Sequence, residues 1–177
     1  MKIALRIILL AVLAALGVWL WLVVFPGPEK VIRKRLTEIA RTASFSSNQS
    51  DLARLAAAQG LAGCFATNIE VSIDVPGHGR ITLSGRDEIM QTALAARGAM
   101  SGLSVKFPDI NVTVAPDKQS AVADLTLEAI ILGEADHIVQ EMKFTLQKID
   151  GQWLITRVET IRTLSRRRPG VAHHFEL

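Results

Sequence analysis

The sequence predicts an α+β domain, with three helices packed on a curved, mostly antiparallel sheet, behind one N-terminal transmembrane helix. Three patterns lead to this prediction. A long apolar run opens the chain, helical spacing of apolar residues follows, and period-two alternation dominates the second half. At 177 residues the chain has room for one ordinary domain beside such an appendage.

The apolar run Ile7–Phe25 contains no charged or strongly polar residue. As a helix rising about 1.5 Å per residue, it would nearly span the ~30 Å hydrocarbon layer of a bilayer. It is longer than the apolar region of a cleaved signal peptide and does not end in small residues. Trp19 and Trp21 near its end suit the lipid–water interface. We therefore expect an uncleaved membrane anchor over residues 1–28.

Basic residues flank this anchor on both sides. Lys2 and Arg6 precede it and favour an N-terminus inside the cell, whereas Lys30 and Arg33–Arg35 follow it and by count favour the reverse. We expect a single-pass protein of the cell membrane with a periplasmic or extracytoplasmic domain, because the second cluster falls within a predicted helix. Those cations either contact anionic lipid headgroups or form a solvated helix face.

Three helices are predicted in the folded domain, which we place at residues 29–165. The first covers residues 29–44. The second begins at Ser50 or Asp51 and the third at Ser84, which are residue types that cap helix N-termini. From their spacing, the inner faces are predicted to be Ile32, Leu36, Ile39 and Ala43, then Leu52, Leu55, Ala56 and Leu61, then Ile89, Ala93 and Leu94.

Period-two alternation predicts a hairpin and then a four-stranded meander. The hairpin strands are Ile69–Val75 and Ile81–Leu83. Pro108 should bend the first meander strand, because proline cannot donate to a ladder. The dipeptide Asp150-Gly151 indicates a two-residue hairpin turn. The meander strands are predicted at Leu103–Ala115, Ser120–Leu132, His137–Ile149 and Gln152–Leu164, followed by a tail over 166–177.

This order of elements resembles the nuclear transport factor 2-like superfamily, including its SnoaL-like members. The resemblance covers Glu29–Leu164 and is carried by the Ser84–Ile89 start of the third helix and by the Asp150–Ile155 hairpin. It implies a cystatin-like cone, in which a curved sheet wraps around a helix and leaves a pocket. The superfamily includes isomerases, dehydratases, cyclases, ligand carriers and assembly modules, so the resemblance implies no single function.

The last strand carries the candidate site residues. Trp153 and Ile155 set its predicted inner face, and without a bulge Arg157 and Glu159 would point inward beside Gln140. Glu159 is then the candidate catalytic base, since a carboxylate in a dry pocket gains basicity. Gln140, Arg157 and Trp153 are the candidate ligand-binding residues. With a bulge, Arg157 and Glu159 turn outward or form an ion pair at the sheet margin.

Composition argues against several kinds of function. The chain has no tyrosine, which is the usual phenolic donor of the superfamily's enzymes. A formal charge of +3 and scattered aromatic residues argue against a nucleic-acid partner. Cys64 is the single cysteine, and its apolar neighbours indicate a buried core residue. No histidine has a partner at metal-ligand spacing, so we expect neither a metal nor another cofactor.

Two functions remain open at this point. The first is a membrane-tethered, non-enzymatic domain that binds a partner protein or a small apolar ligand outside the cytoplasmic membrane, and a homodimer is compatible with it. The second is a tethered lyase, isomerase or hydrolase with Glu159 as base. The predicted inner faces are almost entirely aliphatic, which favours the first.

Overall fold

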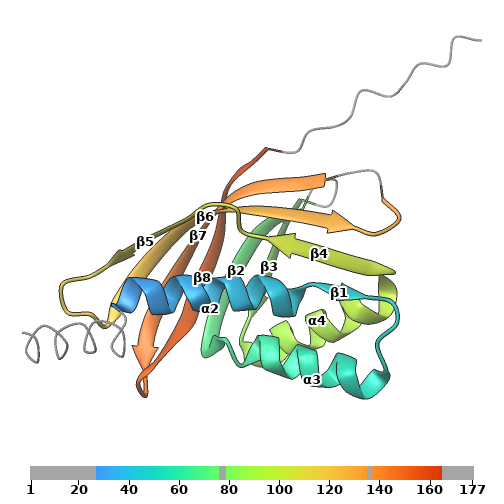
Figure 1. The fold of residues 1–177 in the computed structure, drawn as a ribbon, viewed down its shortest axis with the longest axis horizontal. Helices are drawn as coiled ribbons and strands as arrows, with labels where there is room; N and C mark the ends of the chain where they lie inside the picture. Colours follow the sequence, from blue (N-terminus) through green and yellow to red (C-terminus); the bar gives the residue numbers. More distant parts are fainter. Residues whose placement is uncertain (1–26, 76–78, 135–136, 165–177) are drawn as a thin grey trace, which may run out of the picture.

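The computed structural model describes residues 27–75, 79–134 and 137–164 (Figure 1). The predicted membrane segment Ile7–Phe25 and the predicted tail over 166–177 lie outside the described residues. Within the three described ranges, no helix is both long enough and apolar enough to cross a membrane.

The strands of the described residues form one curled sheet. Its order is β1-β4-β6-β7-β8-β2-β3, with β5 also paired to β6. Neighbouring strands run antiparallel except β2 and β8, which are parallel. The strands are β1 (Phe45–Ser46), β2 (Phe65–Val75), β3 (Gly79–Ser84), β4 (Gly102–Lys106), β5 (Ile110–Val114), β6 (Ser120–Ile131), β7 (His137–Ile149) and β8 (Gln152–Thr163).

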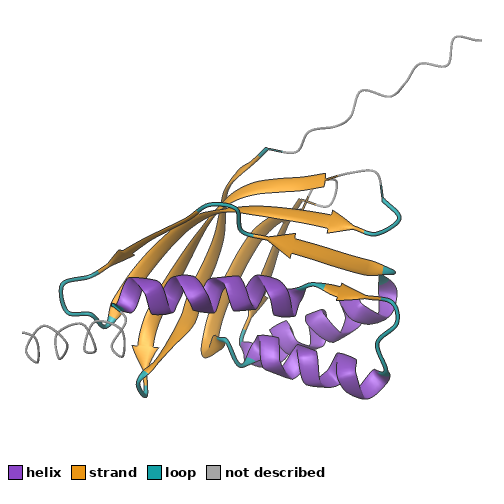
Figure 2. Ribbon diagram, in the orientation of Figure 1, coloured by secondary structure: helices purple, strands orange, loops and turns teal. Residues whose placement is uncertain are grey.

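Three helices cover one side of this sheet (Figure 2). They are α2 (Pro28–Ala43), α3 (Asp51–Ala62) and α4 (Arg86–Ala99). Helix α2 lies along β4 and β5, whereas α4 lies against β2 and β3 and packs on α3. The predicted α+β arrangement of three helices on a curved, mostly antiparallel sheet is confirmed.

Proline and glycine shape the meander as predicted. β4 and β5 both pair with β6 on either side of Pro108, so the first predicted strand is indeed bent there. Asp150 and Gly151 have φ values of 50° and 79°, the left-handed backbone of a two-residue hairpin turn. The two-residue strand β1 was not predicted, because nothing in its polar surroundings indicates a strand.

The helix N-termini differ in how they are capped. The Ser50 side chain accepts a hydrogen bond from the backbone N of Ala53 at 3.3 Å, which confirms the predicted cap. The predicted cap at Ser84 is wrong. Gly85, with φ 86°, occupies the N-cap position, and Glu88 Oε2 instead accepts from the backbone N of Ser84 at 2.6 Å.

The inner face of α2 is the predicted one, since Ile32 and Leu36 are fully buried against the sheet. The predicted inner face of α3 is wrong. Leu52 is 77% exposed, and Ala58 and Ala62 are buried instead. Both stripes have helical spacing, and the contact of α3 with α4 and α2 selects the alanine face.

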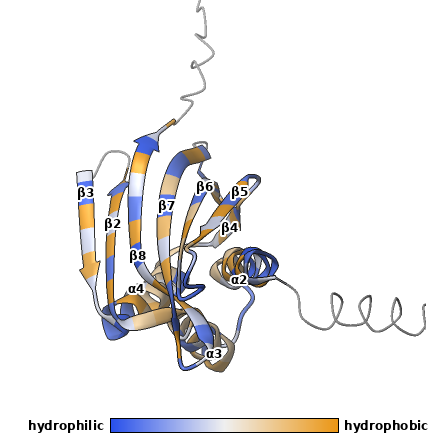
Figure 3. Cartoon of the chain, turned by 90° about the vertical axis from the view of Figure 1, so that its left-hand side faces the viewer, coloured by the Kyte–Doolittle hydropathy of each residue, from blue (hydrophilic) through white to orange (hydrophobic). Residues whose placement is uncertain are grey.

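Apolar side chains fill the space between helices and sheet. The inner faces of β6 and β7 alternate as predicted, and Figure 3 shows hydrophobic and hydrophilic residues alternating along the strands. Phe107 packs edge-on against Phe144, with ring centroids 5.9 Å apart. Each fully buried Leu or Ile contributes about 1.5–3 kcal/mol to stability. The fully buried large residues are Ile32, Leu36, Ile69, Leu146 and Ile155.

Candidate functional site

A β-bulge in β8 decides where the predicted catalytic carboxylate lies. The register between β7 and β8 shifts at Thr156, which has no partner of its own in the ladder. An extra residue moves the strand alternation by one position. Ile155 before the bulge and Val158 after it are therefore both buried, whereas Arg157 and Glu159 turn to the outer face. The inward orientation expected in the absence of a bulge does not occur.

Arg157 and Glu159 take part in ion pairs on that outer face. Arg157 Nη2 lies 2.9 Å from Oε2 of Glu70 on β2, and its Nε lies 3.5 Å from Oε1 of Glu159. The side chains of Arg157, Glu70 and Glu159 are 54%, 63% and 39% exposed, so each pair contributes only about 0–1 kcal/mol. A solvated carboxylate beside a guanidinium lacks the dry surroundings that make a carboxylate a strong base.

Gln140 does face the interior, but its amide is bonded to other parts of the protein. It is 3% exposed, and its Nε2 donates to the backbone oxygen of Asp74 and, at 3.1 Å, to Oγ1 of Thr163. Thr160 Oγ1 accepts from the backbone N of the same Asp74 at 3.1 Å. Because β2 stops pairing with β8 at Ser72, these side chains hold the end of β2 in place.

Trp153 lies far from Gln140 along the sheet, near the start of α2. It is 7% exposed and belongs to the main core cluster. It also lines a hollow of about 250 Å³ together with Pro28, Val31, Lys118, Lys148 and Gly151. The structure therefore does not bring the four predicted site residues together: one pair lies outside, and the two inward residues lie apart.

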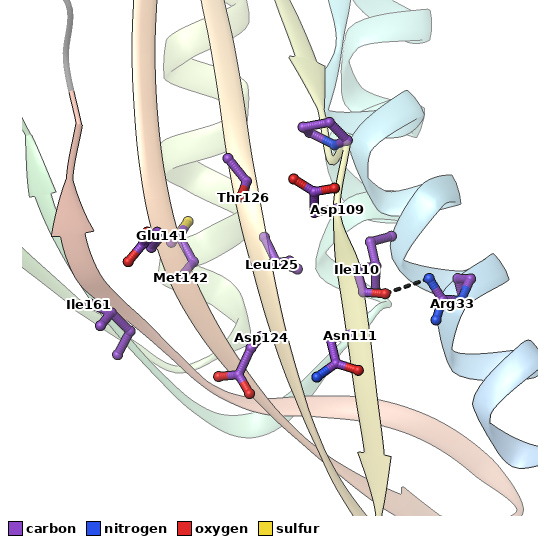
Figure 4. Close-up of a pocket in the computed structure, with 11 residues that line it drawn as sticks. Arg33, Asp109, Ile110, Asn111, Asp124, Leu125, Thr126, Glu141, Met142 and Ile161 are labelled. Atoms are coloured by element: carbon purple, nitrogen blue, oxygen red, sulfur yellow. Dashed lines mark hydrogen bonds between the residues drawn. The ribbon is translucent and has the colours of Figure 1, made fainter.

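A larger hollow, of about 550 Å³, crosses β5, β6 and β7 (Figure 4). Strand register places Asn111, Asp124, Thr126 and Glu141 on one face of these strands. The lining contains three carboxylates and one cation, so it is acidic. Its residues are Arg33, Pro108, Asp109, Ile110, Asn111, Asp124, Leu125, Thr126, Glu141, Met142 and Ile161.

Arg33 closes one side of this hollow. Its Nη1 donates to the backbone oxygen of Ile110, which joins α2 to the edge strand β5 (Figure 4). An edge carbonyl needs such a donor, because no further strand pairs with it. Arg33, one of the cations following the predicted anchor, thus has a structural partner within the domain.

The described residues offer little reactive chemistry. They contain no group of three or more His, Cys, Asp or Glu side chains that could hold a metal ion. Cys64 is buried, as predicted, and its Sγ lies 3.4 Å from the backbone oxygen of Gly60. Burial raises the pKa of the Cys64 thiol, so the thiol stays protonated and is a poor nucleophile.

Sequence reasoning missed one buried charge, Arg97 of α4, which is 4% exposed. Its guanidinium donates to the backbone oxygen of Thr42 in the last turn of α2 and lies 4.8 Å above the centre of the Phe45 ring. Burial lowers the pKa of Arg97. The free carbonyls at the C-terminus of α2 favour a cation at this point, so Arg97 joins two helices. No spacing pattern distinguishes it from an exposed arginine.

No protein-family model matches the sequence, and no curated protein sequence is detectably similar to it. Solved structures do match. A putative scytalone dehydratase from Novosphingobium aromaticivorans is 22% identical with a TM-score of 0.57, over 78% of this chain and 85% of that one. An NTF2-like protein of unknown function from Pseudomonas putida is 13% identical with a TM-score of 0.55, over 73% and 82% of the two chains. The chain has the cystatin-like fold of the NTF2-like proteins.

The solved structures with this NTF2-like, cystatin-like fold carry names that indicate different functions. The yeast UBP3-associated protein Bre5 is 15% identical with a TM-score of 0.57, over 78% of this chain and 97% of that one. One neighbour is thus named as a dehydratase and another as an associated protein. At these identities the similarity shows the fold alone.

Proposed function

We propose that this chain is a membrane-tethered, non-enzymatic binding domain that takes a partner protein at the outer side of the cytoplasmic membrane. The observation that carries the proposal is the position of Glu159, the candidate base. It lies on the outer face beside Arg157, and the buried polar or charged residues of the described part are Arg97, Gln140 and Thr160. Each of these three bonds to the protein backbone.

The acidic hollow across β5–β7 is the proposed binding surface. Asp109, Asp124 and Glu141 supply negative charge, while Ile161, which is 56% exposed, supplies apolar surface. A partner segment with lysine or arginine between apolar side chains matches this lining in charge and in polarity. Such an open, mixed surface suits a peptide better than it suits a reacting small molecule.

The proposed tether determines where this binding takes place. The segment Ile7–Phe25 is proposed to anchor the chain, with the domain on the extracytoplasmic side. Tethering raises the effective concentration of the domain near membrane partners, so a shallow surface can suffice. The neighbour named as UBP3-associated supports an association role for the fold.

The enzymatic alternative is a tethered lyase, isomerase or hydrolase with Glu159 as base. The neighbour named as a putative scytalone dehydratase shares its fold with this chain. The outward position of Glu159 argues against transferring that activity, because a base must lie within hydrogen-bond reach of a bound substrate.

A photo-crosslinking residue at Asn111, inside the acidic hollow, tests the proposal in intact membranes. We expect a discrete protein adduct from Asn111 and none from the matched exposed position Gln91 on α4. Asp124→Lys should remove the adduct, because it reverses the charge of the hollow, while Glu159→Gln should keep it. Equal adducts from both positions would contradict the proposed surface. A reporter fused after Leu177 that is active only in the cytoplasm would contradict the proposed orientation.

A further inference from the structure

Three segments meet where α2 begins, and Figure 1 shows them gathered at one end of the domain. They are the first turn of α2, the β5–β6 turn and the β7–β8 hairpin. Together they line the hollow of about 250 Å³ beside Trp153. We call this end the proximal face and define it by Val31, Lys118, Lys148 and Ile149.

The hollow in the proximal face is lined by positive charge. Lys118 and Lys148 are its two titratable lining residues. Neither forms an ion pair with another residue in the part of the chain that the structure describes. Glu29, Asp117 and Asp150 lie on the same three segments but do not line the hollow. Two ammonium groups around one hollow favour an anion such as a phosphate group.

Apolar side chains accompany these lysines. Val31 is 40% exposed and Ile149 is 36% exposed, although both are large aliphatic residues. Trp153 lines the same hollow, although its side chain is largely buried in the core. Lysines surrounding exposed aliphatic residues are typical of surfaces that lie on a bilayer.

The proposed tether places this face close to a membrane. Only Pro26 and Gly27 separate Phe25, the last residue of the apolar run, from Pro28, and these three chain steps span at most about 10 Å. The polar headgroup layer on each side of a bilayer is roughly 5–8 Å thick. If Ile7–Phe25 crosses the bilayer, as the proposed function holds, Pro28 lies within or just outside that layer.

We propose that the proximal face binds the headgroups of anionic phospholipids. Lys118 and Lys148 hold the lipid phosphate, while Val31 and Ile149 rest at the boundary of the acyl chains. The contact fixes how the domain is oriented on the membrane, in addition to the tether. This inference rests on the proposed tether, so its test must separate the two.

The test uses the full chain reconstituted into lipid nanodiscs. A nitroxide spin label is attached at Gln152→Cys, an exposed position beside the β7–β8 turn, in a Cys64→Ala background. Its accessibility to oxygen and to a water-soluble nickel chelate reports its depth. We expect headgroup depth in discs that contain phosphatidylglycerol and full solvent exposure in discs of phosphatidylcholine alone. Lys118→Gln with Lys148→Gln should reduce the immersed population about fivefold per lysine.

The matched control is Lys106→Gln with Lys143→Gln, which removes the same charge from positions outside the proximal face and should leave the depth unchanged. A label that stays in water in both kinds of disc, on a chain that remains in the disc after an alkaline wash, overturns the headgroup site and leaves the tether intact. A chain that the wash removes overturns the tether itself. If inorganic phosphate lowers the accessibility of the label to the nickel chelate while the label stays out of the lipid, the site binds free phosphate. That result would overturn the lipid proposal.

Discussion

The side-chain amide of Gln140 on β7 donates to the backbone oxygen of Asp74 on β2, across the intervening strand β8. A bond between strands that are not neighbours in a sheet is unusual, because ladder bonds join adjacent strands only. It is possible here because the inner side of the sheet is strongly curled. Gln140 thereby supports the end of β2 after its pairing with β8 has stopped.

Replacement of Gln140 by leucine should destabilise the domain by about 1–3 kcal/mol. The change leaves the Asp74 carbonyl and the Thr163 hydroxyl, whose bonds to Gln140 are partly buried, without their donor, and an unsatisfied polar group out of water carries that cost. Urea unfolding followed by the circular dichroism of the sheet measures it. The exposed Gln147→Leu on the same strand should shift stability by no more than about 0.5 kcal/mol. An equal loss of stability in the two variants would contradict the role of Gln140.

The ion pair of Asp74 with Arg80 should appear in the pH dependence of stability. Arg80 Nε lies 2.9 Å from Asp74 Oδ1, and the hydrogen bond from Arg80 lowers the pKa of Asp74. A lowered folded-state pKa contributes stability above the unfolded pKa, and this contribution disappears as the pH falls through the folded pKa. Asp74→Asn should therefore flatten the acid limb of the stability curve.

A double-mutant cycle with Arg80→Gln checks the assignment of this pH dependence. The two single variants and the double variant should lose the same acid-limb component, because each removes the same pair. The measurement is thermal unfolding across the acid range at low salt, where an exposed pair is screened least. Fully additive effects of the two changes would show that the pair is not the cause.

Cys64 should react slowly with alkylating reagents in the folded protein. It is 5% exposed, and burial raises the pKa of its thiol, so both access and thiolate content are low. Reaction with iodoacetamide should modify a single thiol per chain, and only after urea has unfolded the sheet. Rapid stoichiometric labelling of the native protein at neutral pH would show that the thiol is reachable after all.

Two glycine-to-alanine changes should have opposite signs. A Cβ at Gly102 would lie 2.5 Å from Cδ1 of Leu132 and 3.1 Å from the backbone oxygen of Phe45, so Gly102→Ala should cost about 1–3 kcal/mol. Nothing lies within 4 Å of a Cβ at Gly98 in α4. Gly98→Ala should stabilise the domain by up to about 0.5–1 kcal/mol, because alanine favours the helix. The unfolding midpoints of the two variants, compared with that of the unchanged protein, test both signs.

The features predicted correctly from the sequence are those set by short-range patterns. Strand alternation located β6, β7 and β8 to within one residue at each end, and Pro108 and Asp150-Gly151 marked a bend and a turn. These signals lie within a few residues of one another along the chain. The same holds for the Ser50 cap, which depends on its own neighbours.

The features that were not predicted from the sequence depend on packing between distant segments. Helix α3 carries two apolar stripes, and only its contacts with α2 and α4 select the stripe with Ala58 over the one with Leu52. The sequence left open whether β8 bulges, because Leu154 and Val158 would fit either strand face, and the structure shows the alternative with the bulge at Thr156. Arg97 needs the carbonyl of Thr42 and the ring of Phe45, which lie far away in sequence.

The bulge at Thr156 has a consequence for how such a chain could change during evolution. One inserted residue determines which side of β8 Arg157 and Glu159 occupy, while every side chain keeps its chemical identity. Deletion of Thr156 would restore plain alternation with Arg157 and Glu159 still on the outer face, whereas regular pairing with Thr156 retained would carry both into the aliphatic interior. The difference between a closed apolar core and a charged pocket on this scaffold therefore depends on whether β8 bulges at one residue, so a survey of point substitutions would not reveal it.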